Sequence, residues 1–247
     1  MKKFLQKHAR KFGIKLSRLN DRNDLWYLLE SQILDYKTNV MIDVGANEGQ
    51  FISKVMSNSS LAFEKIYSFE PLPDAFANLQ NRVQDLKTKS KIQTFNIALG
   101  DKNETQNIYV APNSVSSSLL PVADGFKRHL ELEEEAQMQK IGIPVERFED
   151  FAQSLFPSLD FKKDKCFLKL DVQGFEKHVL EGFGPLLDHV PLALLECSLV
   201  EIYRDRPLMG DMFEYMTKKG FHVAGIFPGY FDDETRQLFE VDVVFAR

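Results

Sequence analysis

The stretch Val40–Phe51, with the sequence VMIDVGANEGQF, decides the fold that we predict for this chain. Val40–Val44 is a short apolar run with one acid, Asp43, placed two residues before Gly45. Such a run is typical of a buried parallel strand that ends where the backbone turns sharply. Gly45 and Gly49 let a loop pass close to a ligand, and the apolar residues that follow have helical spacing. We therefore predict a strand, a glycine loop and a helix N-terminus, which together form a site of nucleotide size.

This loop differs from the dinucleotide-binding fingerprint. That fingerprint needs glycine at positions 45, 47 and 50, whereas this chain has Asn47 and Gln50. The carboxylate of Asp43 also suits a cationic ligand better than it suits phosphates. The pattern D-x-G-x-N-x-G after a strand resembles motif I of the class I S-adenosylmethionine (SAM) methyltransferases, whose ligand carries an ammonium and a sulfonium group.

Length and composition favour one large αβ domain. The chain has 247 residues, of which 44% are hydrophobic, enough for a sizeable core. Cys166 and Cys197 lie in apolar runs and are expected to be reduced core thiols. No apolar run approaches the length of a membrane span, and the N-terminus lacks the apolar region of a signal peptide. We expect a cytoplasmic protein of unknown oligomeric state.

The charge is unevenly distributed along the chain. Residues 1–20 contain seven Lys or Arg and no acid, so the remaining residues carry 24 basic against 36 acidic side chains. An acidic body argues against a nucleic-acid partner. The basic arm has two interpretations, a solvated and partly frayed helix or a weak contact with an anionic membrane surface. We divide the chain into an N-terminal helical extension, 1–39, and a main domain, 40–247.

Glu70 is the second candidate ligand-binding residue. It lies 25 residues beyond Gly45, ends a predicted strand, Lys65–Glu70, and is followed by Pro71. In a βαβ unit the second strand lies beside the first, so an acid at its carboxyl end faces the same crevice. An ionised carboxylate there can accept both hydroxyl groups of an adenosine ribose.

The remaining segments complete a Rossmann-like α/β fold. We predict a seven-stranded, mostly parallel sheet with helices on both faces and an antiparallel C-terminal strand pair. Asp24 and Asp74 are predicted helix caps, and the apolar face of the first helix should include Leu34. Further strands are expected at Lys91–Ala98, Gln106–Val110, Cys166–Val172, Leu192–Cys197, His222–Phe227 and Phe239–Ala246, with an extended piece from Ile141 and helices around Val179–Gly182 and Met212–Lys219.

Three further segments concern the surroundings of the site. The turn after the third strand normally borders an adenine in this fold class, so Ala98 and Leu99 are candidate cofactor contacts. The hydroxyl-rich stretch Ala111–Leu120 and the charged stretch Asp124–Lys140, predicted as a helical insertion, form either a mobile cover or a plain surface loop.

The order of these segments resembles the FkbM family of SAM-dependent methyltransferases. The resemblance covers roughly residues 40–247, and its most specific part is LKLDVQGFEKHVLEG, from Leu168 to Gly182. It also includes FEPLPDAF, NIALGD, LLEC and the C-terminal GYFDDETRQLFEVDVVFAR. The resemblance implies that Asp43, Gly45, Asn47 and Gly49 hold the methionine end of SAM and that Glu70 holds its ribose. Gln173 stands where many relatives have Glu, so no charged role is assumed there.

The catalytic candidates are Asp171 and Glu196, which end predicted central strands. Open αβ sheets place their ligands at that point. The family resemblance implies methylation of a hydroxyl group on a sugar, a glycan or a related small molecule, and a hydroxyl needs help to lose its proton. Either carboxylate could act as a general base, or the pair could hold Mg²⁺. The alternatives are an enzyme of the same fold that acts on a protein, and a non-catalytic SAM-binding module.

Overall fold

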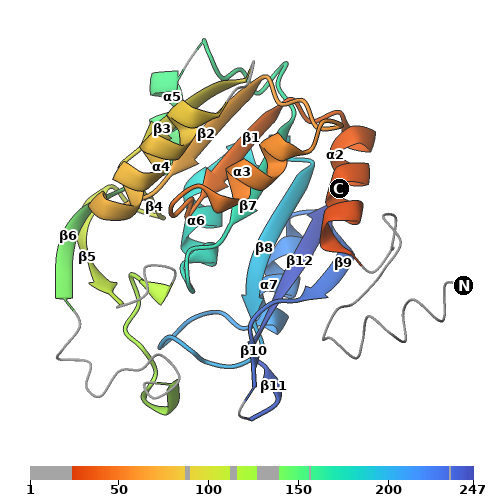
Figure 1. Cartoon of the computed structure of the whole chain (residues 1–247). Coiled ribbons are helices and arrows are strands. Elements are labelled where there is room, and N and C mark those ends of the chain that lie inside the picture. The colour runs from red at the N-terminus through yellow and green to blue at the C-terminus, as the bar shows by residue number, and fades with distance from the viewer. Residues whose placement is uncertain (1–23, 87–89, 112–115, 127–138, 156, 234) are drawn as a thin grey trace, which may run out of the picture.

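The computed structural model describes residues 24–86, 90–111, 116–126, 139–155, 157–233 and 235–247. Its centre is a seven-stranded sheet with the strand order β3-β2-β1-β7-β8-β12-β9 (Figure 1). The strands are β1 (Val40–Val44), β2 (Lys65–Phe69), β3 (Lys91–Phe95), β7 (Cys166–Leu170), β8 (Leu192–Ser198), β9 (His222–Pro228) and β12 (Glu240–Ala246).

The sheet is parallel except for β12, which pairs antiparallel with both β8 and β9. The predicted fold class, including the antiparallel C-terminal pair, is therefore confirmed. Because the chain crosses from β3 back to β7 beside β1, the order reverses between β1 and β7. In open αβ sheets, ligands bind at such a switch point, beyond the carboxyl ends of the strands.

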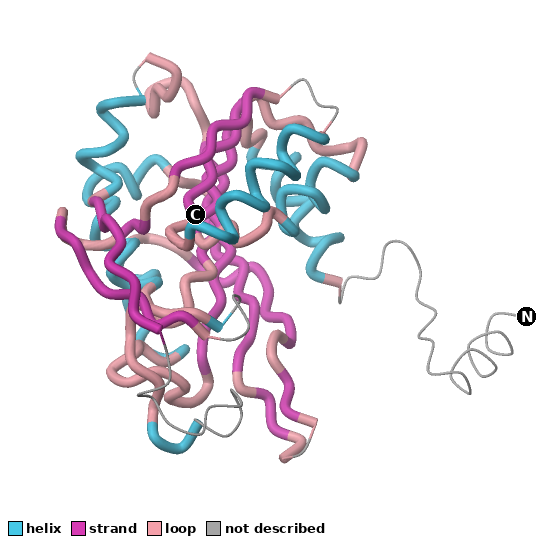
Figure 2. The backbone as a smooth tube through the Cα atoms, turned by 60° about the vertical axis from the view of Figure 1, so that its left-hand side comes forward, coloured by secondary structure: helices cyan, strands magenta, loops and turns pink. Residues whose placement is uncertain are grey.

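Helices cover both faces of the sheet (Figures 1 and 2). Helices α2 (Leu25–Tyr36), α3 (Gln50–Ser57) and α4 (Pro73–Asp85) lie on one side. Helices α5 (Phe148–Leu155), α6 (Glu176–Phe183) and α7 (Met209–Lys218) pack on the other side, together with the 3-10 helix η4 (Gly184–His189). Alternate residues of each strand face the two helical layers, so the sheet separates two hydrophobic clusters.

A smaller sheet of order β4-β6-β5 lies beside the main one. It contains β4 (Ala98–Leu99), β5 (Glu104–Val110) and β6 (Gln139–Glu146), and the chain also forms a short hairpin of β10 (Phe231–Asp232) and β11 (Gln237–Leu238). The predicted strand Lys91–Ala98 is wrong at its end. Asn96 donates hydrogen bonds to the backbone oxygens of Glu70 and Pro71, so the chain leaves the main sheet after Phe95. Ala98 then pairs with β6.

Several local predictions need correction. Asp24 caps α2 as expected, by accepting a hydrogen bond from the Trp26 amide. Leu34, however, is 50% exposed, whereas Leu29 and Ile33 are buried. Asp74 lies inside the first turn of α4 and caps nothing, because Pro73 already occupies the first helical position.

The charged insertion and the basic arm fall largely outside the described residues. The predicted helix Asp124–Lys140 begins with the short 3-10 helix η2 (Asp124–Phe126), and its last two residues belong to strand β6. Residues 127–138 and the basic residues 1–20 are not described. Among the described residues, no helix has both the length and the apolar character needed to cross a membrane.

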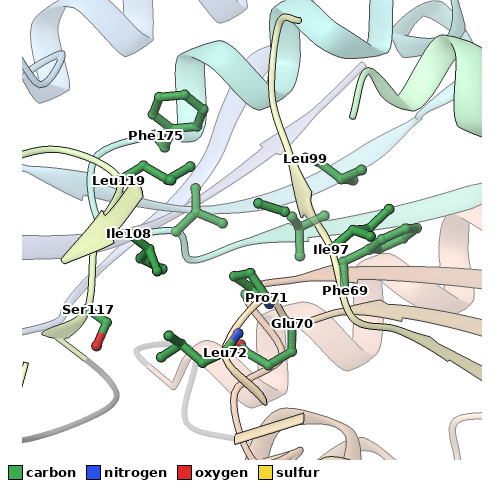
Figure 3. A pocket seen from close by; sticks show the side chains of 14 residues that line it. Phe69, Glu70, Pro71, Leu72, Ile97, Leu99, Ile108, Ser117, Leu119 and Phe175 are labelled. Carbon is green, nitrogen blue, oxygen red and sulfur yellow. The ribbon is translucent and has the colours of Figure 1, made fainter. Parts of the chain in front are cut away.

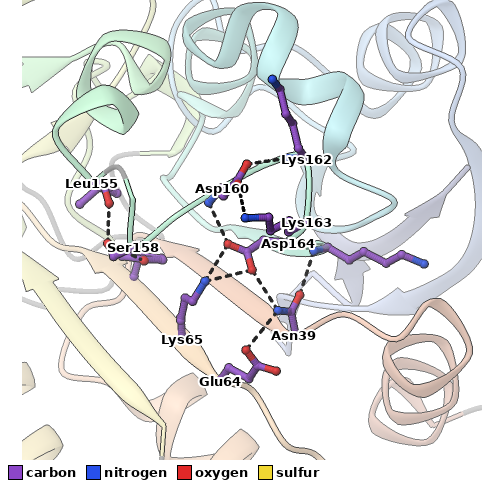
Figure 4. A network of polar contacts seen from close by, with 11 residues as sticks. Asn39, Glu64, Lys65, Leu155, Ser158, Asp160, Lys162, Lys163 and Asp164 are labelled. Atoms are coloured by element: carbon purple, nitrogen blue, oxygen red, sulfur yellow. Dashed lines mark hydrogen bonds and ion pairs between the residues drawn. The ribbon is translucent and has the colours of Figure 1, made fainter.

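The amino edge of the main sheet, where β1, β2 and β7 begin, is closed by a polar network (Figure 4). Asp164 is paired with Lys65 at 2.8 Å and accepts further hydrogen bonds from the Asn39 side chain and the Asp160 amide. The Asn39 side chain also accepts from the Lys165 amide at 2.8 Å. The network ties together the segments that precede the three central strands.

Candidate active site

The opposite edge, which we call the carboxyl edge, carries a row of charged side chains. Asp43 in β1, Lys169 in β7, Glu196 in β8 and Asp242 in β12 alternate along their strands with apolar residues that face α5, α6 and α7. The register pairs Asp43 with Lys169 and Asp242 with Glu196. These four side chains therefore share one face of the sheet, as the two-residue period of a strand requires.

Lys169 links this row to the glycine loop. Its Nζ donates to the backbone oxygen of Gly45 at 2.7 Å and lies 3.2 Å from Asp43 and 3.5 Å from Asp171. Burial alone would lower the pKa of Lys169, but the two carboxylates outweigh burial and raise it. Lys169 is therefore a buried, charged residue that holds the loop and Asp171 together.

Asp43 has a different place from the one predicted. Its side chain is fully buried, lines neither of the pockets described below, and has Lys169 as its ion-pair partner. Burial raises its pKa, and the charge of Lys169 offsets part of that effect. Asp43 therefore contacts the glycine loop through Lys169, and its predicted role toward the methionine end of SAM stays a prediction.

The glycine loop has the conformation that its sequence predicts. Gly45 has φ 74°, and a Cβ there would lie 1.8 Å from the backbone oxygen of Asp171. Only glycine permits this approach between the end of β1 and the end of β7. Gly49 has φ 81°, and a Cβ there would lie 2.9 Å from Leu79 of α4. Gly49 thus serves helix packing and lines neither pocket.

Glu70 faces the same loop, as predicted. It is 5% exposed; one carboxylate oxygen accepts from the Asn47 amide at 2.8 Å, and the other accepts from the Leu72 amide at 2.9 Å. Burial raises the pKa of Glu70 to about 7, despite these two hydrogen bonds. Each oxygen has a second lone pair, so the carboxylate can still accept hydrogen bonds from a diol.

An apolar pocket opens on one side of Gly45 and Glu70 (Figure 3). Figure 3 shows Phe69, Leu99 and Phe175 among the side chains around this space, with the Glu70 carboxylate at its rim. Ala98 and Leu99, the candidate cofactor contacts, both line it from β4. Its walls are Val44, Gly45, Phe69, Glu70, Pro71, Leu72, Ile97, Ala98, Leu99, Ile108, Ser117, Leu119, Val172 and Phe175.

A polar pocket of about 400 Å³ opens on the other side of the same two residues. It lies between α2 and α3, and its walls are Trp26, Gly45, Ala46, Asn47, Gln50, Phe51, Lys54, Glu70, Lys169 and Asp171. The Lys54 ammonium lies 4.1 Å from the centroid of the Trp26 ring, and the rings of Trp26 and Phe51 are 5.1 Å apart. Burial lowers the pKa of Lys54. The walls of this pocket therefore include a cation, Lys54, and a carboxylate, Asp171.

The two predicted catalytic carboxylates lie close together. The side-chain nitrogen of Gln173 donates to Asp171 at 3.1 Å and to Glu196 at 2.8 Å. The Asp171 side chain is 43% exposed and lines the polar pocket, whereas Glu196 lines neither of the two pockets. Burial, then the charge of Asp171, raises the pKa of Glu196 well above its ordinary value. A carboxylate with a raised pKa is a stronger base once it is ionised, which favours proton transfer to Glu196.

Four residues of this site were not assigned from the sequence. Trp26 and Lys54 come from helices whose packing depends on tertiary structure, and Gln173 was noted only for its lack of charge. Lys169 left a signal, because a lysine interrupts the apolar strand CFLKL. Among the described residues, no group of three or more His, Cys, Asp or Glu is arranged to hold a metal ion. Both cysteines are free and buried, as expected.

Comparison with known proteins gives a family match. The model of the methyltransferase FkbM domain matches residues 43–223. No curated protein matches the sequence. Among solved structures, the methyltransferase FkbM from Methylobacillus flagellatus KT has a TM-score of 0.52 and 16% sequence identity. That match covers 83% of this chain but 43% of the other, so this chain spans less than half of its relative's length.

A second solved structure, magnesium protoporphyrin IX methyltransferase from Synechocystis PCC 6803 with bound SAM, has a TM-score of 0.44 and 10% identity, over 99% of this chain and 91% of that one. The methyltransferase domain of bacterial CtHen1 has a TM-score of 0.42 and 13% identity, over 91% of this chain and all of that one.

Proposed function

Because this chain belongs to the FkbM family of methyltransferases, we propose that it transfers the methyl group of SAM to a hydroxyl oxygen of a sugar, a glycan or a related small molecule. The observation that carries this proposal is the pair of pockets that meet at Gly45 and Glu70, with Asp171 beside them. One pocket is apolar and the other is charged, which matches a ligand with a nucleoside at one end and an amino acid at the other.

The residues fit SAM in detail. The apolar pocket offers Ile97, Leu99 and Phe175 to a flat base, and Glu70 at its rim has free lone pairs for the ribose hydroxyl groups. In the polar pocket Lys54 would hold the α-carboxylate, and Asp171 would hold the ammonium group. The close approach of Gly45 to Asp171 leaves backbone instead of side chain where the two pockets join.

When bound, SAM supplies a methyl group on a positively charged sulfur, which is a good leaving group. Alignment of the acceptor oxygen with this methyl group contributes about 7–11 kcal/mol in favourable cases. Transfer would form a C–O bond at the acceptor oxygen and break the C–S bond, whose electron pair would stay on sulfur. The hydroxyl proton passes to a carboxylate oxygen, and we assign that role to Glu196, with Asp171 beside it.

The experiment uses labelled SAM and soluble glycans and small molecules extracted from the source of the protein. We expect label in a hydroxyl-bearing acceptor and a fall in turnover of about 10²–10⁴-fold in Glu196→Gln. Wild-type turnover in both Asp171→Asn and Glu196→Gln would contradict the role of the pair. Label that appears only in protein would replace the proposed acceptor class.

The same assay separates a base from a bound cation. The pair Asp171 and Glu196 could hold Mg²⁺ instead of a proton, since carboxylate oxygens are the ligands that Mg²⁺ prefers. Turnover that survives a chelator supports the general base. Turnover that is lost with a chelator and restored by Mg²⁺ supports the cation.

A further inference from the structure

Gln173 lies between the two candidate catalytic carboxylates and contacts both. Its Nε2 donates to Oδ1 of Asp171 at 3.1 Å and to Oε2 of Glu196 at 2.8 Å. A side-chain amide carries two N–H donors on one nitrogen, so it can serve both acids at once. Two adjacent carboxylates without such a donor tend to share a proton. The amide instead satisfies one oxygen of each and leaves the other oxygen outside this contact.

The oxygen of this amide lies beside Tyr203. The hydroxyl group of Tyr203 lies 3.0 Å from Oε1 of Gln173, and the Tyr203 side chain is buried. Because ionised carboxylates only accept hydrogen bonds, the amide nitrogen must face the two acids and its oxygen must face Tyr203.

The backbone around Gln173 is held as firmly as its side chain. Gln173 has φ 53°, in the left-handed region that non-glycine residues seldom adopt. Its backbone oxygen accepts from the Ser118 hydroxyl at 2.6 Å. On the other side, the Glu176 carboxylate accepts from the amides of Val172 and Gly174. The strained residue is thus supported from two elements.

The supporting segment, residues 116–119, also belongs to the apolar pocket. Ser117 and Leu119 line that pocket, whereas the backbone oxygen of Ser116 lies 2.9 Å from the Tyr203 hydroxyl and Ser118 holds Gln173. Alternate residues of one extended segment therefore face in two directions. One direction serves the pocket that we assign to the nucleoside, and the other serves the carboxylate pair.

We propose that Gln173 is a positioning residue, which holds Asp171 and Glu196 as two separate hydrogen-bond acceptors, and that Tyr203 and the segment 116–119 set its orientation. The proposal rests on the proposed function for its catalytic meaning, because the pair acts on the acceptor hydroxyl. The contact of Gln173 with the two carboxylates can be tested in the absence of a methyl acceptor.

The test is the titration of Glu196 in protein labelled with ¹³C at the glutamate side-chain carboxyl groups. Glu196→Gln identifies the signal, because it removes that one resonance. The charged groups that surround Glu196 stay constant in every other variant: Asp171 and Lys169 from β7, Glu176 from α6, Arg206 from the segment after β8, and Glu240 and Asp242 from β12.

Gln173→Met keeps the length of the side chain and removes both donors. A hydrogen bond to the charged form stabilises that form, so its loss should raise the Glu196 titration midpoint by about one pH unit. If Gln173 only filled space, the Glu196 titration midpoint would stay at its wild-type value. A midpoint within about 0.2 pH unit of the wild type would overturn the proposal.

Tyr203→Phe tests the orientation with a smaller change, and it keeps the proposal testable if Gln173→Met does not fold. We expect a smaller rise in the same direction. The matched control is Tyr67→Phe, because Tyr67 is equally buried and its hydroxyl group donates to Ser158, which lies near the amino edge of the sheet. An equal rise in both tyrosine variants would overturn the role of Tyr203.

The binding of S-adenosylhomocysteine, measured by calorimetry, separates this inference from the proposed function. We expect its dissociation constant to change by less than about twofold in Tyr203→Phe, because Tyr203 lines neither pocket. A wild-type protein that binds no S-adenosylhomocysteine would contradict the proposed function, whereas the titration would still decide the role of Gln173.

Discussion

The two edges of the main sheet use the same kinds of side chain with opposite electrostatic results. At the amino edge, burial would raise the pKa of Asp164, but hydrogen bonds from Asp160, Lys65 and Asn39 outweigh burial and lower it. At the carboxyl edge, burial dominates and the pKa values of Glu70 and Glu196 are raised. A carboxylate whose hydrogen bonds and ion pairs outweigh the cost of burial stabilises the fold. A carboxylate for which burial dominates is available to a ligand or a proton. The difference separates a structural acid from a functional one.

The largest expected effect concerns the lysines of the two edges. Lys169→Met leaves Asp43 fully buried without its ion-pair partner, and we expect the free energy of unfolding to fall by about 3–5 kcal/mol. Lys65→Met is the matched variant at the amino edge. Asp164 keeps its hydrogen bonds from Asp160 and Asn39, so the loss should be about 1 kcal/mol. Chemical denaturation measures both, and equal losses would break the comparison.

The second effect is the pH dependence of stability. The pKa of Glu70 rises from 4.5 to about 7 on folding, so the folded protein binds this proton more tightly than the unfolded chain does. The free energy of unfolding should therefore fall as the pH rises from 4.5 to 7, by about 3 kcal/mol for this group alone. Asp164 acts in the opposite sense, because its lowered pKa stabilises the protein above pH 4 and this contribution is lost in acid.

Glu70→Gln tests this assignment, because glutamine does not titrate. Denaturation at several pH values should show a flatter profile between pH 4.5 and 7 in this variant. Asp242, whose pKa burial raises to about 6, contributes a smaller slope that remains in the variant. An unchanged slope would mean that Glu70 is not the titrating group.

The third effect is on ligand affinity, which should depend on the carboxyl edge and not on the amino edge. Glu70→Ala removes the carboxylate at the rim of both pockets and should weaken S-adenosylhomocysteine binding by about 1.5–3 kcal/mol. Asp164→Asn should lower stability and leave this affinity unchanged, since Asp164 lies at the opposite edge. Calorimetry of the two folded variants measures the difference. A comparable loss of affinity in Asp164→Asn would show that the edges do not act independently.

The sequence predicted those features that depend on neighbouring residues. The strand before Gly45, the sharp turn at that glycine and the acid at position 70 follow from local pattern and from the geometry of a βαβ unit. The strand pattern placed Asp171 and Glu196 at the ends of adjacent central strands, and the structure brings both onto the amide of Gln173.

Features that depend on tertiary packing could not be predicted in the same way. Asp43 looked like a ligand-binding acid because the sequence does not show that Lys169 lies opposite it in the next strand. The polar pocket needs α2 and α3 side by side, so Trp26 and Lys54 meet across 28 residues of chain. The two-residue strand β4 is too short to leave a periodic signal, so Ala98 was placed in the wrong sheet.

The central claim is that one SAM molecule spans the two pockets, with its amino-acid end beside Lys54. The direct measurement compares the affinities of S-adenosylhomocysteine and methylthioadenosine, which lacks the amino acid, for the wild type and Lys54→Gln. We predict that the substitution weakens S-adenosylhomocysteine by roughly fivefold, about 1 kcal/mol, and leaves methylthioadenosine unchanged. Equal weakening of both ligands, or of neither, would contradict the assignment of the polar pocket to the amino acid.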